Sequence, residues 1–490
     1  MRNDRRHHRG GPRPPQRGGK RDMPHRDEAR NAAYDLMRAV DERDAYANLL
    51  MPRMLRDRGI GGRDAALATE LAYGTLRGLG TYDEIIAVCS DREPYDIDPP
   101  VLDAIRLGAH QLLRTRVPAH AAVSATVDLV RLRVGVGPSR FANAVLRKIA
   151  GREIDEWLPI VAPEAADDLV GHLAVTHSHP RWIVEAFLAA LGGDADQTAE
   201  LLAADNDRPK VVLVARPGRA TVDELLAAGG APARYSPQAA YLPEGDPGSF
   251  AAVAEGRAAV QDEASQLVAL ALTRVPVDGA DTRWLDLCAG PGGKAGLLDA
   301  VATHGMPGFA PDGDPGERPG GRPGEHPGGH PGGAHLLAAD LQYHRARLVR
   351  QTTREAAVVT ADGTAPAWRS GVFDRVMVDA PCTGLGALRR RPEARWRRDP
   401  RSVPELAALQ RRLLATAVDA VRPGGVVAYV TCSPHLAETR DVVAGQDGVE
   451  VLDARAYLPE VGDLGEGPYA QFWPHVHGTD AMFLALLRRL

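Results

Sequence analysis

Apolar residues recur at three- and four-residue steps in the first part of the chain, for example at Ala29, Ala32, Leu36 and Val40. This spacing places the apolar side chains on one face of a helix. Prolines divide the segment at intervals that suit about five to seven helices of ordinary length. The pattern predicts an all-α domain over residues 25–152.

A different pattern begins near residue 251, where short apolar runs alternate with helical stretches. Such alternation predicts a doubly wound parallel sheet, so residues 251–490 are expected to form an α/β, Rossmann-like domain. The expected strands are 284–287, 335–339, 358–360, 376–379 and 426–430, and the expected helices are 293–303, 342–354 and 404–421.

Residues 153–250 lie between these two patterns and have a mixed character. Helical spacing appears at 181–191 and 196–204, and a short apolar run after them predicts a strand. Thr221, with Glu224 three residues later, predicts a helix that begins with a capping box. We interpret this segment as a small α+β module.

Two low-complexity segments stand apart from these patterns. The first 21 residues hold eight Lys or Arg against a single acidic residue, Asp4, so residues 1–24 are expected to form a basic, disordered arm. From 307 to 331 a proline stands at every fourth position, usually before a glycine. Because such a run forms neither helix nor strand ladder, residues 305–333 are expected to be a flexible insertion in the α/β domain.

Composition narrows the class of protein. The chain has 490 residues and single cores stop growing near about 250–300 residues, so about three domains are expected. No apolar run approaches the roughly 18 residues of a membrane span, and a signal peptide is not evident, so we expect a cytoplasmic protein without a membrane partner. The four cysteines form no CxxC pair, which predicts free thiols and no metal site.

Two of these cysteines directly follow expected strands. Cys382 stands in DAPCTGLG after the strand at 376–379, and Cys432 stands in TCSPH after the strand at 426–430. In open α/β sheets the ligand cleft lies outside the carboxyl ends of the strands. Neighbouring strands lie about 4.8 Å apart. Both thiols are therefore expected to face one cleft and to reach one substrate.

A basic segment follows Cys382. Residues 389–401 hold seven arginines against Glu393 and Asp399, and they include Trp396. Arginines and an aromatic ring suit contacts to phosphates and to a stacked base, so we expect this segment to border the thiol cleft. A solvated charged face is the alternative interpretation.

A glycine-rich turn follows the first expected strand of the α/β domain. In WLDLCAGPGGK, the residues Gly290, Gly292 and Gly293 let backbone amides approach a ligand at the start of the next helix. A phosphate-binding P-loop is excluded, because Ala295 follows Lys294 where Ser or Thr is required. A plain tight turn is the alternative.

Aspartates end the next two expected strands. Asp340 stands where a carboxylate can bind the two ribose hydroxyls of a nucleoside, and Asp362 stands where one can meet an adenine amino group. Each aspartate alone is equally consistent with a turn or a helix cap. Together with the glycine turn they favour S-adenosylmethionine over a dinucleotide.

Two thiols beside such a cofactor suit methylation of carbon 5 of a pyrimidine. Carbon 5 is a poor nucleophile until a thiolate adds to carbon 6, and a base must later remove the carbon-5 hydrogen so that the thiol can leave. One cysteine attacks and the other assists release, while Asp379 can hydrogen-bond the Watson–Crick edge of an unstacked cytosine. The residues alone do not rank the two cysteines.

The chain closely resembles the RsmB (Sun, Fmu) branch of the RNA (cytosine-5) methyltransferases in the runs LDLCAGPGGK, AADLQYHR, TADGT, DRVMVDAPCTGLGALRRRPEARWR, VTCSPHLAE and HGTDAMFLALLR. Its helical part resembles the NusB-like RNA-binding domain of that branch in RDAALATELAYGTLR, RLGAHQLL, PAHAAVSATVDL and FANAVLRK. These motifs occur in the family's order across most of residues 28–490.

The resemblance implies S-adenosylmethionine as cofactor and RNA as partner. It implies that Cys432 is the nucleophile, that Cys382 assists product release, and that Lys294 touches the cofactor or the base edge. The residues implied to line the cofactor and base site are Ala289, Gly290, Pro291, Gly292, Gly293, Lys294, Ala295, Asp340, Asp362 and Asp379.

We therefore interpret the chain as a monomeric methyltransferase that acts on carbon 5 of a cytosine in RNA, with 16S ribosomal RNA as the expected substrate. A non-catalytic NusB-like RNA-binding or antitermination protein is an alternative, as is methylation of another RNA such as tRNA. A cysteine hydrolase that uses Cys432 and His435 is disfavoured, because residues three apart on a loop rarely form a thiolate pair.

Overall fold

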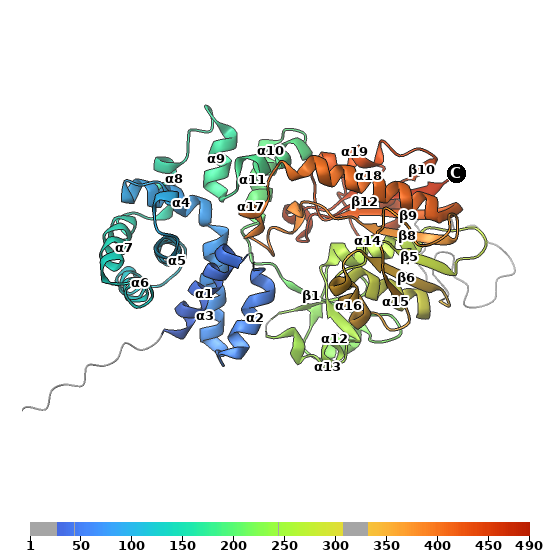
Figure 1. The fold of residues 1–490 in the computed structure, drawn as a ribbon, viewed down its shortest axis with the longest axis horizontal. Coiled ribbons are helices and arrows are strands. Elements are labelled where there is room, and N and C mark those ends of the chain that lie inside the picture. The colour runs from blue at the N-terminus through green and yellow to red at the C-terminus, as the bar shows by residue number, and fades with distance from the viewer. Residues whose placement is uncertain (1–26, 44, 244, 307–331) are drawn as a thin grey trace, which may run out of the picture.

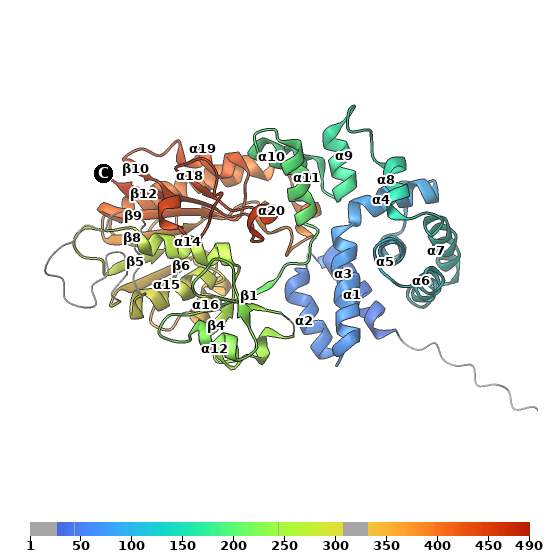
Figure 2. The ribbon, with the colours of Figure 1, turned by 180° about the vertical axis from the view of Figure 1, so that it is seen from behind.

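The computed structural model describes residues 27–490 except residues 44, 244 and 307–331. The basic arm expected at 1–24, and most of the insertion expected at 305–333, lie outside the described residues. Figures 1 and 2 show a helical domain at one end, a large sheet covered by helices at the other, and a smaller sheet beside it. Among the described residues, no helix is both long and apolar enough to cross a lipid bilayer.

The N-terminal part is all-helical, as its apolar spacing predicts. Leu36, Leu71 and Ile105 are fully buried where its helices meet. The helices are α1 (Glu28–Arg43), α2 (Ala47–Asp57), α3 (Gly62–Arg77), α4 (Leu79–Ser90), α5 (Pro99–Arg114), α6 (Ala119–Arg133) and α7 (Val136–Ile149), with a 3-10 turn at Pro94–Asp96.

The middle part has two regions. Four helices come first. The first packs Ile154 and Trp157 into the core of the helical domain, whereas the apolar side chains of the next three share a core with Leu385 and Trp473 of the C-terminal part. A four-stranded antiparallel sheet of order β2-β3-β1-β4 follows. The elements are α8 (Ile154–Val161), α9 (Leu169–His177), α10 (Arg181–Ala190), α11 (Ala195–Ala204), β1 (Val211–Ala215), α12 (Val222–Ala227), β2 (Ala231–Pro232), β3 (Ala239–Leu242), a 3-10 turn at Pro247–Ser249, α13 (Ala251–Ala254) and β4 (Ala258–Val260).

Two details of this module differ from the sequence expectation. Strand β4 lies beyond residue 250, so the boundary placed there would separate β4 from its partner β1. At the start of α12, the hydroxyl of Thr221 accepts a hydrogen bond from the Glu224 amide at 3.1 Å. The Glu224 carboxylate does not close the capping box, because it pairs with Arg257 at 2.7 Å.

The C-terminal part is built on an eight-stranded sheet with the order β10-β12-β9-β8-β5-β6-β7, and β11 pairs with β12. The expected strands and helices of the Rossmann-like core are all present. The elements are α14 (Glu263–Arg274), β5 (Arg283–Asp286), α15 (Gly293–His304), β6 (His335–Asp340), α16 (Tyr343–Thr352), β7 (Ala357–Thr360), β8 (Phe373–Asp379), α17 (Ala394–Arg397), α18 (Ser402–Ala420), β9 (Val421–Thr431), α19 (Arg440–Val443), β10 (Val449–Leu452), β11 (Ala470–Gln471), α20 (Pro474–His477) and β12 (Phe483–Arg489), with 3-10 turns at Leu385–Ala387, Leu436–Glu438 and Ala454–Tyr457.

The sheet is mixed and not wholly parallel, which corrects the expectation. Strands β5 to β9 run parallel, whereas β12 pairs antiparallel with β9 and β10 pairs antiparallel with β12. No long crossover helix separates β9 from β12, so β12 is free to enter the sheet in the opposite direction.

Both faces of this sheet are covered. Along β8, Val376 and Val378 pack with the α18 side chains, while Met377 points to the opposite face and packs with α14 and α15. Side chains of a strand alternate between faces, so a continuous apolar run is required here. This burial fixes β8 and β9 at the centre of the domain and thereby fixes the loops at their carboxyl ends.

Most of the arginine-rich segment 389–401 lies between the domains, which corrects the interpretation as a solvated charged face. Only part of it borders the thiols as expected, since the Arg391 charge acts on Cys432. Arg395 is fully buried. Its guanidinium donates to the backbone oxygens of Arg77 and Ser178 at 3.1 Å each and to that of Asp205 at 2.8 Å. These oxygens stand at the carboxyl ends of α3, α9 and α11, where helix carbonyl groups lack intrahelical partners.

Two neighbouring residues of the segment, Trp396 and Arg397, also contact the helical domain. Arg397 donates to the backbone oxygens of Val40 and Ala45, at 2.8 and 2.7 Å, near the end of α1. Trp396 packs so close to Gly80 that a Cβ atom there would meet the indole at 2.5 Å. The segment therefore joins the helical domain to the sheet domain, and its charges are mostly used inside the protein.

Replacement of Arg395 by methionine is expected to destabilise the contact between these domains. Loss of the guanidinium leaves several buried acceptors without donors, which costs about 3–5 kcal/mol. Thermal unfolding monitored together with limited proteolysis measures the effect. Arg401→Met is the matched control, because the Arg401 side chain is 89% exposed and pairs with Asp399 nearby. Equal stability of the two variants would contradict the structural role of Arg395.

Candidate active site

The two cysteine thiols lie together at the carboxyl edge of the large sheet. Strands β8 and β9 are parallel neighbours, with Asp379 opposite Val430 in the register. Cys432 follows β9 directly, and Cys382 follows β8 by three residues. Their Sγ atoms are 3.4 Å apart. Both side chains are half-buried, so a substrate atom can reach them without unfolding of the loops.

Their surroundings give the two thiols different acidities. A hydrogen bond from the Cys382 thiol lowers the pKa of Cys432, and the charges of Lys294 and Arg391 act in the same direction, against burial and the Asp379 carboxylate. The same contact raises the pKa of Cys382, and burial and Glu438 add to that effect. Because the thiolate is the nucleophilic form, the electrostatics favour Cys432 as the attacking sulfur.

Lys294 and Asp379 form an ion pair beside the thiols. Lys294 lies in the first turn of α15, and its Nζ atom donates to Oδ2 of Asp379 at 2.9 Å. Burial lowers the pKa of Lys294, but the Asp379 carboxylate outweighs burial and the net pKa is raised. Oδ1 of Asp379 has no hydrogen bond among the described residues, so one acceptor remains for a ligand.

The glycine turn between β5 and α15 packs tightly against the end of β6. The Gly290 amide donates to Oδ2 of Asp340 at 3.0 Å, and the Arg345 guanidinium donates to the Gly290 carbonyl. A Cβ atom at Gly290 would meet Asp340 at 2.4 Å. Gly292 has φ of +115°, a conformation that L side chains rarely adopt. Only glycine therefore fits this turn.

The other residues of the predicted cofactor set lie around this turn. Ala289 is buried, and its amide donates to the Ala339 carbonyl at 2.9 Å. Pro291 continues the turn, and Gly293 and Ala295 belong to the first turn of α15, so all of them line the same edge of the sheet as Lys294. The structure thus brings the sequence from Ala289 to Ala295 next to Asp340 and Asp379.

Asp362 stands further out. It follows β7 and is exposed, and its Oδ1 atom accepts bonds from the amide and the hydroxyl of Thr364, each at 2.8 Å. This is a local turn of the kind that aspartates commonly form. Its second oxygen has no hydrogen bond among the described residues and remains free for a ligand.

Asp286 is a candidate residue that the sequence analysis did not single out. It ends β5, is fully buried, and neither carboxyl oxygen makes a well-formed hydrogen bond in the part of the chain that is described. Burial raises the pKa of Asp286 to about 8, and the Asp379 carboxylate adds to this. The signal in the sequence was an acidic residue inside the apolar run WLDL, where an unpaired charge is costly.

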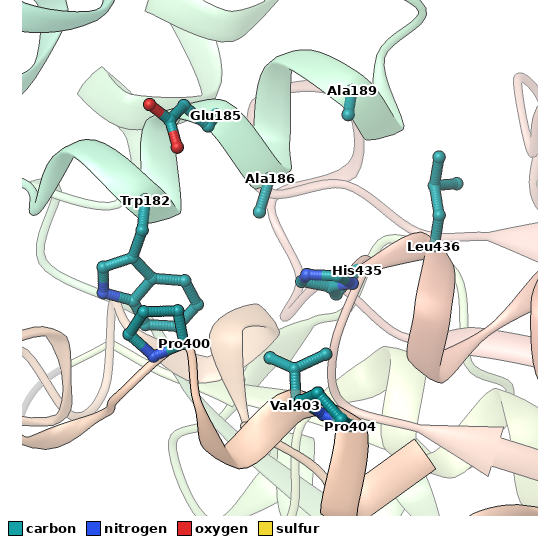
Figure 3. Close-up of a pocket in the computed structure, with 9 residues that line it drawn as sticks. All are labelled: Trp182, Glu185, Ala186, Ala189, Pro400, Val403, Pro404, His435 and Leu436. Carbon is teal, nitrogen blue, oxygen red and sulfur yellow. The ribbon is translucent and has the colours of Figure 1, made fainter. Parts of the chain in front are cut away.

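His435 does not serve as a base for Cys432. Its Nδ1 atom accepts the amide of Ala437 at 3.2 Å, and its ring has no hydrogen bond to either thiol among the described residues. The ring lines a pocket of about 420 Å³. Figure 3 shows the ring pointing into this pocket. The hydrolase interpretation therefore lacks its catalytic pair. The pocket is lined by Trp182, Glu185, Ala186, Ala189, Pro400, Val403, Pro404, His435 and Leu436.

In the described ranges no three His, Cys, Asp or Glu residues gather closely enough to hold a metal ion. The chemistry that the site offers is that of a lowered-pKa thiol, a second thiol in contact with it, and an ammonium–carboxylate pair.

Comparison with known proteins identifies the family. A family model described as 16S rRNA methyltransferase RsmB/F matches residues 319–488, and a NusB family model matches residues 27–151. A ribosomal RNA small subunit methyltransferase B of Erwinia tasmaniensis is 31% identical over 474 residues, which cover 93% of this chain and 97% of that protein. The chain belongs to the RsmB/F methyltransferase family. It is an S-adenosylmethionine-dependent RNA methyltransferase.

Further matches cover between two thirds and nearly the whole of this RsmB/F protein. A putative methyltransferase of Mycobacterium tuberculosis is 52% identical over 471 residues, which cover 95% of this chain and 97% of the relative. The solved structure of a protein named PH0851 has the same fold, with a TM-score of 0.73 at 20% identity, covering 95% of this chain and 100% of that one. A methyltransferase homolog protein from Pyrococcus horikoshii has a TM-score of 0.51 at 18% identity, covering 66% of this chain and 99% of that one.

Proposed function

We propose that this RsmB/F protein transfers a methyl group to carbon 5 of a cytosine in small-subunit ribosomal RNA, through a covalent bond between Cys432 and carbon 6 of the base. The observation that carries this proposal is the contact of two thiols, 3.4 Å apart, at adjacent strand ends beside the Lys294–Asp379 pair. An RNA-binding protein without activity has no use for a thiol pair in this setting.

The residues present fit S-adenosylmethionine. A buried carboxyl with unpaired oxygens, Asp286, suits the positively charged methionine portion, and the glycine turn leaves backbone amides near a ligand. Asp340 accepts one backbone amide on each oxygen, from Gly290 and Gln342, and each oxygen keeps a second acceptor site that suits a ribose hydroxyl. Asp362 suits the adenine amino group. When bound, the cofactor would supply an electrophilic methyl group, and its sulfonium sulfur would keep the bonding electron pair as a neutral thioether when the methyl group leaves.

In the proposed reaction Lys294 and Asp379 hold the cytosine. The free oxygen of Asp379 accepts from the amino group at carbon 4, and the remaining protons of the Lys294 ammonium donate to a ring acceptor. A base must leave its stack to enter such a site, so the target is expected in a loop or a strained region of the RNA.

The proposed methyl transfer forms and breaks a covalent bond between Cys432 and the base. The Cys432 thiolate bonds to carbon 6, and the electron pair of the 5,6 double bond moves to carbon 5, which takes the methyl group. The proton on carbon 5 then passes to Cys382 acting as a thiolate. The 5,6 double bond re-forms, and the carbon–sulfur bond breaks with its electron pair returning to Cys432.

The surroundings of Cys382 support this order. Before attack, the charge and hydrogen bond of Cys432 raise the pKa of Cys382 and keep that thiol protonated. Once Cys432 has become an uncharged thioether, those two causes disappear. The pKa of Cys382 then falls, while burial and the Glu438 carboxylate still raise it, so the thiol becomes better able to give its proton to solvent only after the covalent intermediate exists.

Support for ribosomal RNA as substrate comes from relatives. The matched proteins of Erwinia tasmaniensis and Bacillus subtilis carry names for small-subunit ribosomal RNA methyltransferases, the latter as a probable one, at 31% and 27% identity. The NusB-family match over α1–α7 adds a domain of an RNA-binding type, and Arg395 and Arg397 fasten this domain to the segment that follows Cys382.

The test is product analysis with the full chain. The protein is incubated with unmethylated 16S ribosomal RNA and methyl-labelled S-adenosylmethionine, and the RNA is digested to nucleosides and separated with mass detection. We expect the label in 5-methylcytidine, and more label in ribosomal RNA than in tRNA. Label in 5-methyluridine or in a nitrogen-methylated base would overturn the proposed chemistry, and a preference for tRNA would overturn the proposed substrate.

A further inference from the structure

A buried carboxylate, Glu438, lies beneath both cysteine loops. It ends the 3-10 turn Leu436–Glu438 and is fully buried. Within the described residues it forms no ion pair with a lysine or arginine, and its oxygens are satisfied by hydrogen bonds alone. Burial of a carboxylate away from water is unfavourable unless donors surround it. Such a group is therefore expected to have a purpose that an apolar side chain could not fulfil.

The donors come from the residues that directly follow the two cysteines. The Thr383 amide donates to Oε1 of Glu438 at 2.8 Å, and the Thr383 hydroxyl donates to Oε2. The Ser433 hydroxyl donates to the same Oε2 atom at 2.6 Å. The two hydroxyl oxygens are themselves 3.1 Å apart. One carboxylate thus binds the loop of Cys382 and the loop of Cys432 simultaneously.

Helix α18 and strand β9 hold this carboxylate in place. The Gln410 amide donates to Oε1 of Glu438 at 3.2 Å and to the Pro381 carbonyl at 2.8 Å. The Tyr429 hydroxyl donates to the backbone oxygen of Glu438 at 2.7 Å. Since Gln410 and Tyr429 are both fully buried, the clamp is fixed to the rigid core of the sheet.

We infer that Glu438 is a positioning residue that sets the separation of the two thiols by clamping Thr383 and Ser433. The inference rests on the proposed function in one respect, because that function requires both cysteine sulfurs to reach the same RNA base. Attack requires Cys432 alone, whereas release requires Cys382 to reach the base that Cys432 already holds. Loss of the clamp should therefore impair release more than attack.

A cross-linking experiment without RNA tests the geometry. The free protein is treated with diamide, which takes two electrons and two protons from a pair of thiols and leaves a disulfide. The Cys382–Cys432 disulfide is followed by peptide mass spectrometry. Loss of the Glu438 charge lowers the pKa of Cys382, which by itself favours oxidation. Proximity governs closure of the disulfide, so Glu438→Ala should still slow its formation by about tenfold or more. Glu450→Ala is the matched control, since Glu450 is an exposed carboxylate on β10 far from both loops.

A second set of variants guards against a general loss of folding. Glu438→Gln keeps the shape but loses the charge and two acceptor sites, and Ser433→Ala and Thr383→Val each remove one donor. In a double-mutant cycle, each donor variant combined with Glu438→Gln should slow disulfide formation by less than the product of the two single effects. If the double variant slowed disulfide formation by the full product of the two single effects, the proposed clamp would be contradicted.

The RNA-dependent readout is the share of protein found as a denaturant-stable RNA adduct during turnover. We expect this share to rise in Glu438→Gln, because release is slowed more than attack. An unchanged disulfide rate in Glu438→Ala, in protein that melts as the parent does, would overturn the positioning role. A slowed disulfide rate in a protein whose parent makes no 5-methylcytidine would overturn the proposed function and leave the clamp standing.

Discussion

Replacement of Cys432 by alanine is expected to abolish methyl transfer, with a loss of at least about 10⁴-fold in turnover, the order seen when a covalent nucleophile is removed. Without this sulfur nothing adds to carbon 6, so carbon 5 never becomes nucleophilic. The variant should form no denaturant-stable complex with RNA. Incorporation of labelled methyl groups into RNA, together with gel analysis under denaturing conditions, measures both effects.

The matched control for this result is Cys89→Ala. Cys89 is a buried thiol in α4 of the helical domain, and burial raises its pKa to about 11, so it is inert as a nucleophile. The control variant should methylate RNA at the parental rate. Normal activity of Cys432→Ala would refute the covalent mechanism altogether.

Replacement of Cys382 by alanine is expected to trap the reaction after methyl transfer. The carbon-5 proton then lacks its base, the carbon–sulfur bond to Cys432 cannot break, and a protein–RNA adduct accumulates that survives denaturant. Up to one adduct per protein molecule should form, whereas the parent shows only a small fraction. The measurement is a mobility shift of the protein on a denaturing gel, reversed by ribonuclease.

The double variant Cys382→Ala/Cys432→Ala decides whether the trapped bond is the one proposed. It should form no adduct, because the sulfur that bonds to the base is gone. An adduct in Cys432→Ala and none in Cys382→Ala would exchange the two roles and contradict the acidities that the site imposes on these thiols.

Much of the fold follows from local patterns that the sequence shows directly. The apolar runs of β5, β8 and β9 and the spacing in α1 to α7 arise from burial, and burial leaves a periodic trace. The thiol pair was predictable for a related reason, since parallel strands end at the same edge and Cys382 and Cys432 each follow one.

The parts of the fold and of the site that the sequence did not predict depend on contacts between residues far apart in the sequence. In the sequence Arg395 is indistinguishable from the other arginines of the basic segment. Its burial results from contacts with the ends of three helices, which the sequence does not show. The direction of β12 depends on how the preceding loop returns to the sheet. The positioning role of Glu438 depends on its hydrogen bond from Thr383, which is 55 residues away in the sequence. Hydrogen bonds between distant residues leave no periodic signal.

The arginine contacts between the domains have a consequence for substrate choice. Arg395 and Arg397 fasten the ends of α1, α3, α9 and α11 to a chain segment that begins seven residues after Cys382. These contacts therefore hold the helical domain and the two reactive sulfurs at a fixed distance and orientation. On the proposed function, we expect an RNA bound to the helical domain to present to the two cysteines only a nucleotide at a fixed distance. The three-dimensional shape of the RNA, more than the bases around the target, is then expected to determine which cytosine is methylated.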